Sequence, residues 1–138
     1  AYLIGELSGR VALMNYDKGN LTPACFVEAD TLHVSGSADI HITPDGRFLY
    51  ASNRLKGDGI AIFSIDPADG QLTKVGYQLT GIHPRNFVIT PNGKFLLCAC
   101  RDSNVVQLYE IDKQSGLLRD TGKDIRVDKP VCLKFTDM

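Results

Sequence analysis

Five charged or titratable side chains in this sequence each lie next to a short apolar segment. They are Glu6, Arg54, His83, Arg85 and Arg101. A carboxylate can accept a proton from a nearby group, and guanidinium groups bind anions through charge-assisted hydrogen bonds. The set could therefore form a site for an anionic ligand, provided that the fold brings the residues together.

These residues also have structural interpretations that need no ligand. Glu6 and Arg54 could form an ion pair between neighbouring parts of the fold, because buried charges are usually paired. Arg101 could be a solvated loop charge. His83 stands before a proline and could bond to backbone alone, whereas His41 lies in a predicted strand and is expected in the core.

An internal repeat indicates which elements must position the five side chains. The segment ITPDGRFLY, residues 42–50, returns as ITPNGKFLL, residues 89–97, and the similarity continues beyond it with a period of 46 to 47 residues. This period is typical of β-propeller blades and is too long for leucine-rich repeats. Frequent Gly and Pro and the lack of a helical apolar period exclude a helical solenoid.

Each repeat is predicted to contain four short strands, named a to d from the propeller axis outward. Thr43 to Gly46 and Thr90 to Gly93 make tight turns between strands a and b, because proline presets φ and glycine accepts a positive φ. Aromatic and aliphatic residues fill the strands. The sequence therefore predicts an all-β fold of antiparallel sheets with essentially no helix.

The predicted strands add up to twelve, or about three blades in a circularly shifted frame. Residues 1–30 supply strands b to d, 38–79 and 87–127 supply two full blades, and 131–135 supply strand a of a further blade. Three blades cannot close a ring, so we expect part of a larger propeller. The antiparallel order places the ends of the b strands and the d-to-a connections on one face, where a ligand site is expected.

Composition narrows the possible partners. The 138 residues carry 15 basic and 16 acidic side chains and no basic run, so no nucleic-acid partner is expected. The sequence lacks an apolar run of membrane-spanning length and a recognisable leader, so no membrane association is expected. The four cysteines lack zinc-knuckle spacing, and we expect them to be small buried side chains in the cytoplasm, with the periplasm as the alternative. They are Cys25, Cys98, Cys100 and Cys132.

Five ordered motifs together resemble the seven-bladed lactonase family, which includes bacterial 6-phosphogluconolactonase of the propeller type and fungal carboxymuconate cycloisomerase. The motifs are GEL at 5–7, ADIHITPDG at 38–46, YASNR at 50–54, PRNF at 84–87 and PVCLKF at 130–135. The similarity covers nearly the whole chain. It implies that the chain corresponds to the C-terminal three-sevenths of a family member.

The resemblance also implies roles for particular residues. Glu6 matches the family's glutamate in an Asn-Glu-Leu segment, with Gly5 in place of the asparagine, and Arg54 matches the arginine of its Ser-Asn-Arg motif. Arg85 matches a later Pro-Arg arginine. Two further family motifs, one with a histidine and one reading Pro-Arg-His, lie upstream of the glutamate in the family and are absent from this chain.

The leading functional hypothesis is a lactonase-like hydrolase that opens a small anionic sugar-acid lactone. Glu6 and Arg54 would be catalytic, and Arg85, His83 and Arg101 would bind the substrate. We expect no metal and no cofactor. A muconate-type cycloisomerase and a non-catalytic binding or scaffold propeller are the alternatives.

The strand count also suggests how isolated copies of this chain could assemble. Residues 131–135 of one copy could pair with residues 2–7 of another, and the reverse, in a homodimer with a two-fold axis. Such strand complementation would cover edges and apolar faces that a three-blade chain leaves open.

Overall fold

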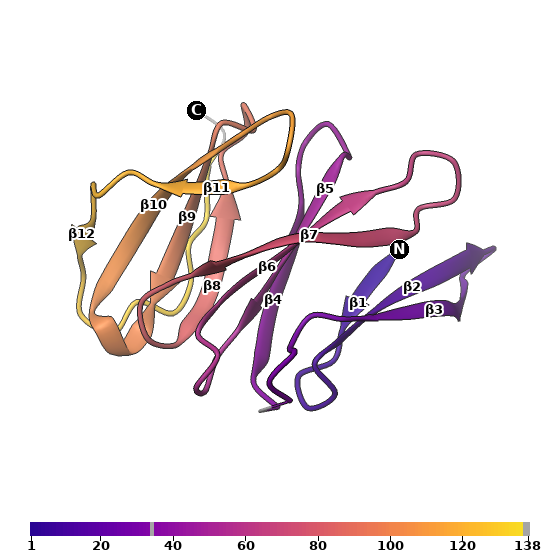
Figure 1. Ribbon diagram of the computed structural model, residues 1–138, viewed down its shortest axis with the longest axis horizontal. Helices are drawn as coiled ribbons and strands as arrows, with labels where there is room; N and C mark the ends of the chain where they lie inside the picture. The colour runs from indigo at the N-terminus through magenta and orange to yellow at the C-terminus, as the bar shows by residue number, and fades with distance from the viewer. Residues whose placement is uncertain (34, 137–138) are drawn as a thin grey trace.

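The computed structural model describes residues 1–33 and 35–136, which form three antiparallel sheets in sequence order across Figure 1. The first sheet contains β1 (Tyr2–Ile4), β2 (Arg10–Asp17) and β3 (Asn20–Glu28). The second contains β4 (Ser37–Ile42), β5 (Phe48–Asn53), β6 (Gly59–Ile65) and β7 (Leu72–Leu79). The third contains β8 (Pro84–Ile89), β9 (Phe95–Cys100), β10 (Val105–Ile111), β11 (Leu118–Asp120) and β12 (Ile125–Arg126). Within the described residues, the helical part is one 3₁₀ turn, η1 (Arg101–Ser103).

The predicted all-β blade architecture and its repeated turns are confirmed. The Gly46 amide donates to the Thr43 carbonyl at 2.9 Å, and the Gly93 amide donates to the Thr90 carbonyl at 2.8 Å. The two threonine hydroxyls also accept equivalent bonds from the first residue of the following strand, at 3.1 and 3.0 Å. The repeat in the sequence therefore produces the same turn twice, at the same end of neighbouring sheets.

The predicted strand at residues 131–135 is wrong for this structure, in which these residues form no strand. A strand needs a partner for its backbone groups, and this segment makes a side-chain contact instead: the Leu133 amide donates to Asn86 Oδ1 at 2.7 Å. The twelfth strand comes from the outer edge of the third sheet. There β11 and β12 both pair with β10, separated by a turn at Gly122 with a positive φ of 66°.

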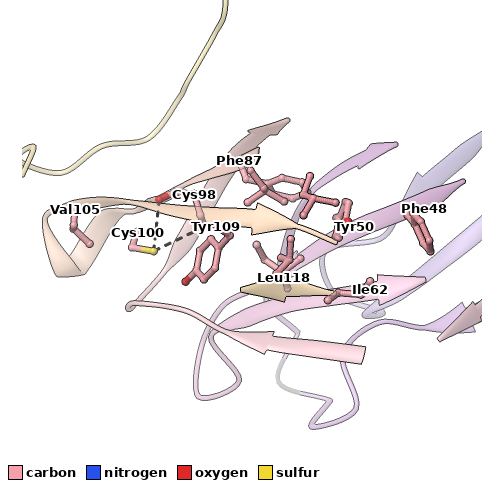
Figure 2. Close-up of a cluster of buried hydrophobic side chains, with 12 residues drawn as sticks. Phe48, Tyr50, Ile62, Phe87, Cys98, Cys100, Val105, Tyr109 and Leu118 are labelled. Atoms are coloured by element: carbon pink, nitrogen blue, oxygen red, sulfur yellow. Dashed lines mark hydrogen bonds between the residues drawn. The ribbon is translucent and has the colours of Figure 1, made fainter. Parts of the chain in front are cut away.

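The central strands of the second sheet, β5 and β6, are buried on both faces, and their successive residues point to opposite sides. Phe48 and Tyr50 of β5 pack toward the third sheet, in the cluster drawn in Figure 2, whereas Leu49 and Ala51 pack toward the first. Phe63 of β6 lies fully buried in this latter cluster. Each such large apolar side chain stabilises the fold by about 1.5–3 kcal/mol, so packing between blades is a main source of stability.

The cysteines follow the sheet geometry. Cys98 and Cys100 share one face of β9, are fully buried, and have Sγ atoms 3.8 Å apart as free thiols (Figure 2). Cys25 is half-buried. The expectation of burial is wrong for Cys132, which is exposed because its segment is not part of a sheet. In the described part of the chain, no helix is long and apolar enough to cross a membrane.

Candidate functional site

An open cavity of about 310 Å³ lies where the inner strands of the three sheets come together at one end of the molecule. Three of the five predicted site residues, Glu6, Arg54 and Arg85, line this cavity. Its other lining residues are Ile4, Ser37, Ala38, Asp39, Asn86 and Val131. The fold therefore brings together predicted site residues that lie up to 79 positions apart, between Glu6 and Arg85.

Glu6 and Arg54 form an ion pair between the first and second sheets. Nη2 of Arg54 donates to Oε1 of Glu6, and the Ser37 amide donates to the Glu6 carbonyl at 3.2 Å. The Glu6 side chain is 62% exposed, whereas that of Arg54 is only 7% exposed. The carboxylate is thus accessible from the cavity while its guanidinium partner is held beneath it.

The Arg54 guanidinium is fixed by contacts on each of its nitrogens. Nε donates to the Gly36 carbonyl at 3.0 Å, and Nη1 lies 3.2 Å from Nε2 of His83. Nη2 approaches the Ser37 carbonyl at 3.4 Å besides bonding to Glu6. A planar guanidinium held along several edges has one orientation, so Arg54 presents a fixed charge to the cavity.

The two residues before Arg54 explain why this arginine is so well placed. The Ser52 hydroxyl accepts a bond from the Asp39 amide at 3.1 Å. Asn53 is fully buried; its Oδ1 accepts a bond from the Ser37 hydroxyl at 2.7 Å. These bonds attach the end of β5 to the beginning of β4, so the Ser-Asn-Arg motif is both a support and a functional group.

Arg85 contributes a second, less constrained positive charge. It stands on β8 in the third sheet, is exposed, and lines the same cavity as Arg54. Across the described residues, its guanidinium makes no side-chain hydrogen bond or ion pair. This group is available to bind an anion that enters the cavity.

His83 and Arg101, also predicted to bind substrate, do not line this cavity. His83 is 9% exposed and contacts Nη1 of Arg54, whereas Glu6 accepts its bond from Nη2. Its Nδ1 is 3.3 Å from Oδ2 of Asp102, and Arg101 donates to the same carboxylate at 2.9 Å. Burial, followed by the charges of Arg101 and Arg54, lowers the pKa of His83 below its usual value and favours the neutral imidazole.

Asp39 is a cavity residue that we did not predict from the sequence. Its Oδ2 accepts bonds from Asn86 Nδ2 at 2.6 Å and from the Phe87 amide at 3.0 Å, which joins β4 to β8. Burial opposes ionisation, but bonds from His41, Phe87 and Ile40 together lower the pKa of Asp39. Asp39 and Asn86 occupy equivalent positions in consecutive repeats, and this correspondence is the signal that could have identified them.

A metal site was not expected. Residues 1–33 and 35–136 contain no group of three or more His, Cys, Asp or Glu side chains that could hold a metal ion.

Comparison with known proteins supports the repeat and motif interpretation. The family model described as "Lactonase, 7-bladed beta-propeller" matches residues 1–135. A 6-phosphogluconolactonase from Formosa agariphila is 43% identical over 131 residues, which are 92% of this chain and 37% of that protein. A second one, from Enterobacter, is 38% identical over 128 residues, which are 89% of this chain and 38% of the relative.

Solved structures of lactonases also match nearly the whole of this chain. A candidate 6-phosphogluconolactonase from Bacteroides fragilis matches 99% of this chain and 38% of its own, with 63% identity and a TM-score of 0.97. The periplasmic gluconolactonase of Pseudomonas aeruginosa matches 99% of this chain and 39% of its own, with 31% identity and a TM-score of 0.91. This chain thus spans under two-fifths of the length of these relatives. It belongs to the seven-bladed β-propeller lactonase family.

Proposed function

We propose that the whole protein is a lactonase that hydrolyses the ring ester of an anionic sugar-acid lactone. The observation that carries this proposal is the cavity in which an accessible carboxylate, Glu6, lies beside the fixed guanidinium of Arg54 and near the exposed guanidinium of Arg85, which has no side-chain partner among the described residues. The names of the relatives, 6-phosphogluconolactonase and gluconolactonase, support the same substrate class.

In the proposed reaction, Glu6 acts as the general base. Its carboxylate accepts a proton from water while the water oxygen bonds to the lactone carbonyl carbon. The bond between that carbon and the ring oxygen then breaks, and the ring oxygen takes up the proton as a hydroxyl. The sum is the addition of one water molecule to the ester, and no redox step is needed.

The two arginines would have different electrostatic roles. Arg54 holds Glu6 in position and stabilises negative charge on the carbonyl oxygen, because its orientation is set before substrate binds. Arg85 would bind the anionic group of the substrate, for which an exposed guanidinium in the cavity is suited. We place the protein in the cytoplasm, a compartment that suits its four free cysteines.

The test is to assay the full-length protein with 6-phosphoglucono-δ-lactone and glucono-δ-lactone, correcting for spontaneous hydrolysis. Glu6→Gln keeps the size of the side chain and removes the base, so we expect kcat to fall about 10²- to 10⁴-fold. The matched control is Glu110→Gln, which alters another carboxylate paired with an arginine, the partly exposed Glu110 beside Arg119, away from this cavity. That control should leave kcat unchanged.

Urea denaturation distinguishes a catalytic Glu6 from a purely structural ion pair. The Glu6 carboxylate is 62% exposed, and glutamine keeps an oxygen that can accept the bond from the buried Arg54 guanidinium. Glu6→Gln should therefore lose activity while its free energy of unfolding falls by no more than about 1 kcal/mol. Wild-type turnover in this variant would contradict the proposed role of Glu6. Arg85→Ala should raise KM more for the phosphorylated lactone than for the unphosphorylated one, because it removes a positive charge from the binding cavity.

A further inference from the structure

His83 contacts Arg54 of the proposed catalytic pair but is not among the residues that line the cavity. Its ring contacts Arg54 through Nε2 at 3.2 Å and Asp102 through Nδ1 at 3.3 Å. Arg54 in turn donates to Glu6. A continuous series of polar contacts thus runs from Asp102 through His83 and Arg54 to Glu6, across all three repeats.

The chemistry of arginine determines which tautomer this chain requires. A guanidinium donates hydrogen bonds and cannot accept them, so Nε2 of His83 must carry the lone pair toward Arg54. The proton of the neutral ring is then on Nδ1, where it points to the carboxylate of Asp102. Protonation of Nε2 would remove the acceptor and place two positive charges side by side.

The backbone conformation of His83 is energetically unfavourable. His83 has a positive φ of 62°, in the left-handed region that side chains with a Cβ enter rarely. Its amide donates to Asp58 Oδ1 at 2.6 Å, and its carbonyl accepts a bond from the Arg101 amide at 3.0 Å. The surrounding structure therefore holds an unfavourable backbone conformation in which the ring reaches Arg54.

We propose that His83 is a positioning residue which, as the neutral Nδ1–H tautomer, accepts a hydrogen bond from Arg54 and thereby orients the Arg54–Glu6 pair. Asp102 holds the tautomer by accepting the Nδ1 proton. Its carboxylate is kept ionised by the hydrogen bond from Arg101 and by the nearby Lys129, whose Nζ lies 3.6 Å away. The effect on turnover rests on the proposed lactonase function, but the tautomer does not.

The charged groups around His83 fix the direction of the pH dependence. Arg54, Arg85 and Arg101 disfavour the imidazolium, Asp102 favours it, and the lowered pKa of His83 shows that burial and the arginines prevail. The bond from Arg54 is therefore intact above the pKa of His83. It is lost as the pH falls through that value, which lies below the usual 6.5 or so of histidine.

Two variants of the full-length protein distinguish the effect of the hydrogen-bond acceptor of His83 from the effect of the volume of its ring. His83→Gln offers Arg54 an oxygen that does not titrate, whereas His83→Leu has similar volume and no acceptor; both carry the same backbone strain. We expect kcat to fall about tenfold in the leucine variant, the effect of one hydrogen bond to a charged group, with KM little changed. The glutamine variant should keep kcat within about threefold of wild type and lose the contribution of His83 to the acid limb of the pH profile.

The ¹⁵N NMR spectrum of the wild-type protein with labelled histidine tests the tautomer without reference to activity. An unprotonated Nε2 and a protonated Nδ1 at neutral pH are expected for His83. Protonation of Nε2, or equal kcat and pH profiles in the leucine and glutamine variants, would overturn the proposal. If the leucine variant does not fold, the glutamine pH profile and the NMR spectrum still decide. Absence of lactonase activity together with the expected tautomer would contradict the proposed function alone.

Discussion

Replacing Asp39 by alanine should show how much the contact between neighbouring blades contributes to stability. The Asp39 carboxylate joins β4 to β8 by accepting bonds from the Asn86 side chain at 2.6 Å and the Phe87 amide at 3.0 Å. Phe87 is fully buried, so its amide would lose its partner in the contact between the two sheets. A hydrogen bond to a charged group contributes about 1.5–3 kcal/mol, and we expect Asp39→Ala to lower the free energy of unfolding by about 3 kcal/mol.

Urea denaturation followed by circular dichroism measures this difference. Asp39→Asn keeps an acceptor for the Phe87 amide without the charge, so it should lose about half as much as the alanine variant. Asp124→Ala is the matched control, because Asp124 is exposed, and it should change stability by less than about 0.5 kcal/mol. A double-mutant cycle with Asn86→Ala should give a coupling energy of about 1 kcal/mol, since the two side chains bond directly.

The pH dependence of the Asp39→Ala effect follows from the lowered pKa of Asp39. An aspartate whose folded pKa lies below its unfolded value, near 3.9, contributes stability above that unfolded value, and the contribution is lost as the pH falls through the folded pKa. The difference between wild type and Asp39→Ala should therefore be largest at neutral pH and shrink below about pH 4. A loss under about 1 kcal/mol at pH 7, or one independent of pH, would refute the reasoning.

Three further predictions on stability can be checked by the same denaturation assay. Gly46→Ala and Gly116→Ala impose similar backbone strain, at φ values of 74° and 75°, but only the new Cβ at position 116 meets the Phe48 ring. Gly116→Ala should therefore lower the free energy of unfolding by about 2 kcal/mol more than Gly46→Ala. Equal losses in the two variants would contradict this. Tyr50→Phe removes the donor to the Gly116 carbonyl at 2.8 Å and should cost about 1 kcal/mol, with no change in the m-value. Phe63→Ala leaves a cavity in a fully buried position and should cost about 3–5 kcal/mol; a loss below 2 kcal/mol would show that the site collapses.

The local features of this fold follow from short stretches of sequence. Thr-Pro-Asp-Gly and Thr-Pro-Asn-Gly each specify a tight turn, because the proline, the glycine and the threonine hydroxyl act within a few residues of one another. Alternation of residues such as Phe48 and Leu49 specifies strands with two buried faces. The period of the repeat then places the ends of the b strands and the beginnings of the a strands at one end of the molecule, where Glu6, Arg54 and Arg85 line a common cavity.

The strand predicted at 131–135 failed for a reason that lies outside the segment. Its residues resemble those of β4 and β8, but backbone pairing depends on a neighbouring strand, and here Leu133 bonds to the side chain of Asn86. At the opposite edge of the same sheet, a turn at Gly122 divides the outer strand into β11 and β12. Local sequence indicates the propensity of a segment, whereas tertiary contacts decide whether it becomes a strand.

The different roles of the site residues were also decided by tertiary structure. By type and position, Arg54, Arg85 and Arg101 are similar in the sequence, yet their surroundings differ. Arg54 is buried in an ion pair, Arg85 is exposed in the cavity, and Arg101 is bonded to Asp102 outside the cavity. By itself, the sequence determined the blades, their turns and the face on which the charged residues gather, because these depend on local conformation and a fixed period. Only the packing of one blade against the next decided that His83 faces Arg54 rather than a ligand, because burial and hydrogen-bond partners come from residues far apart in the chain.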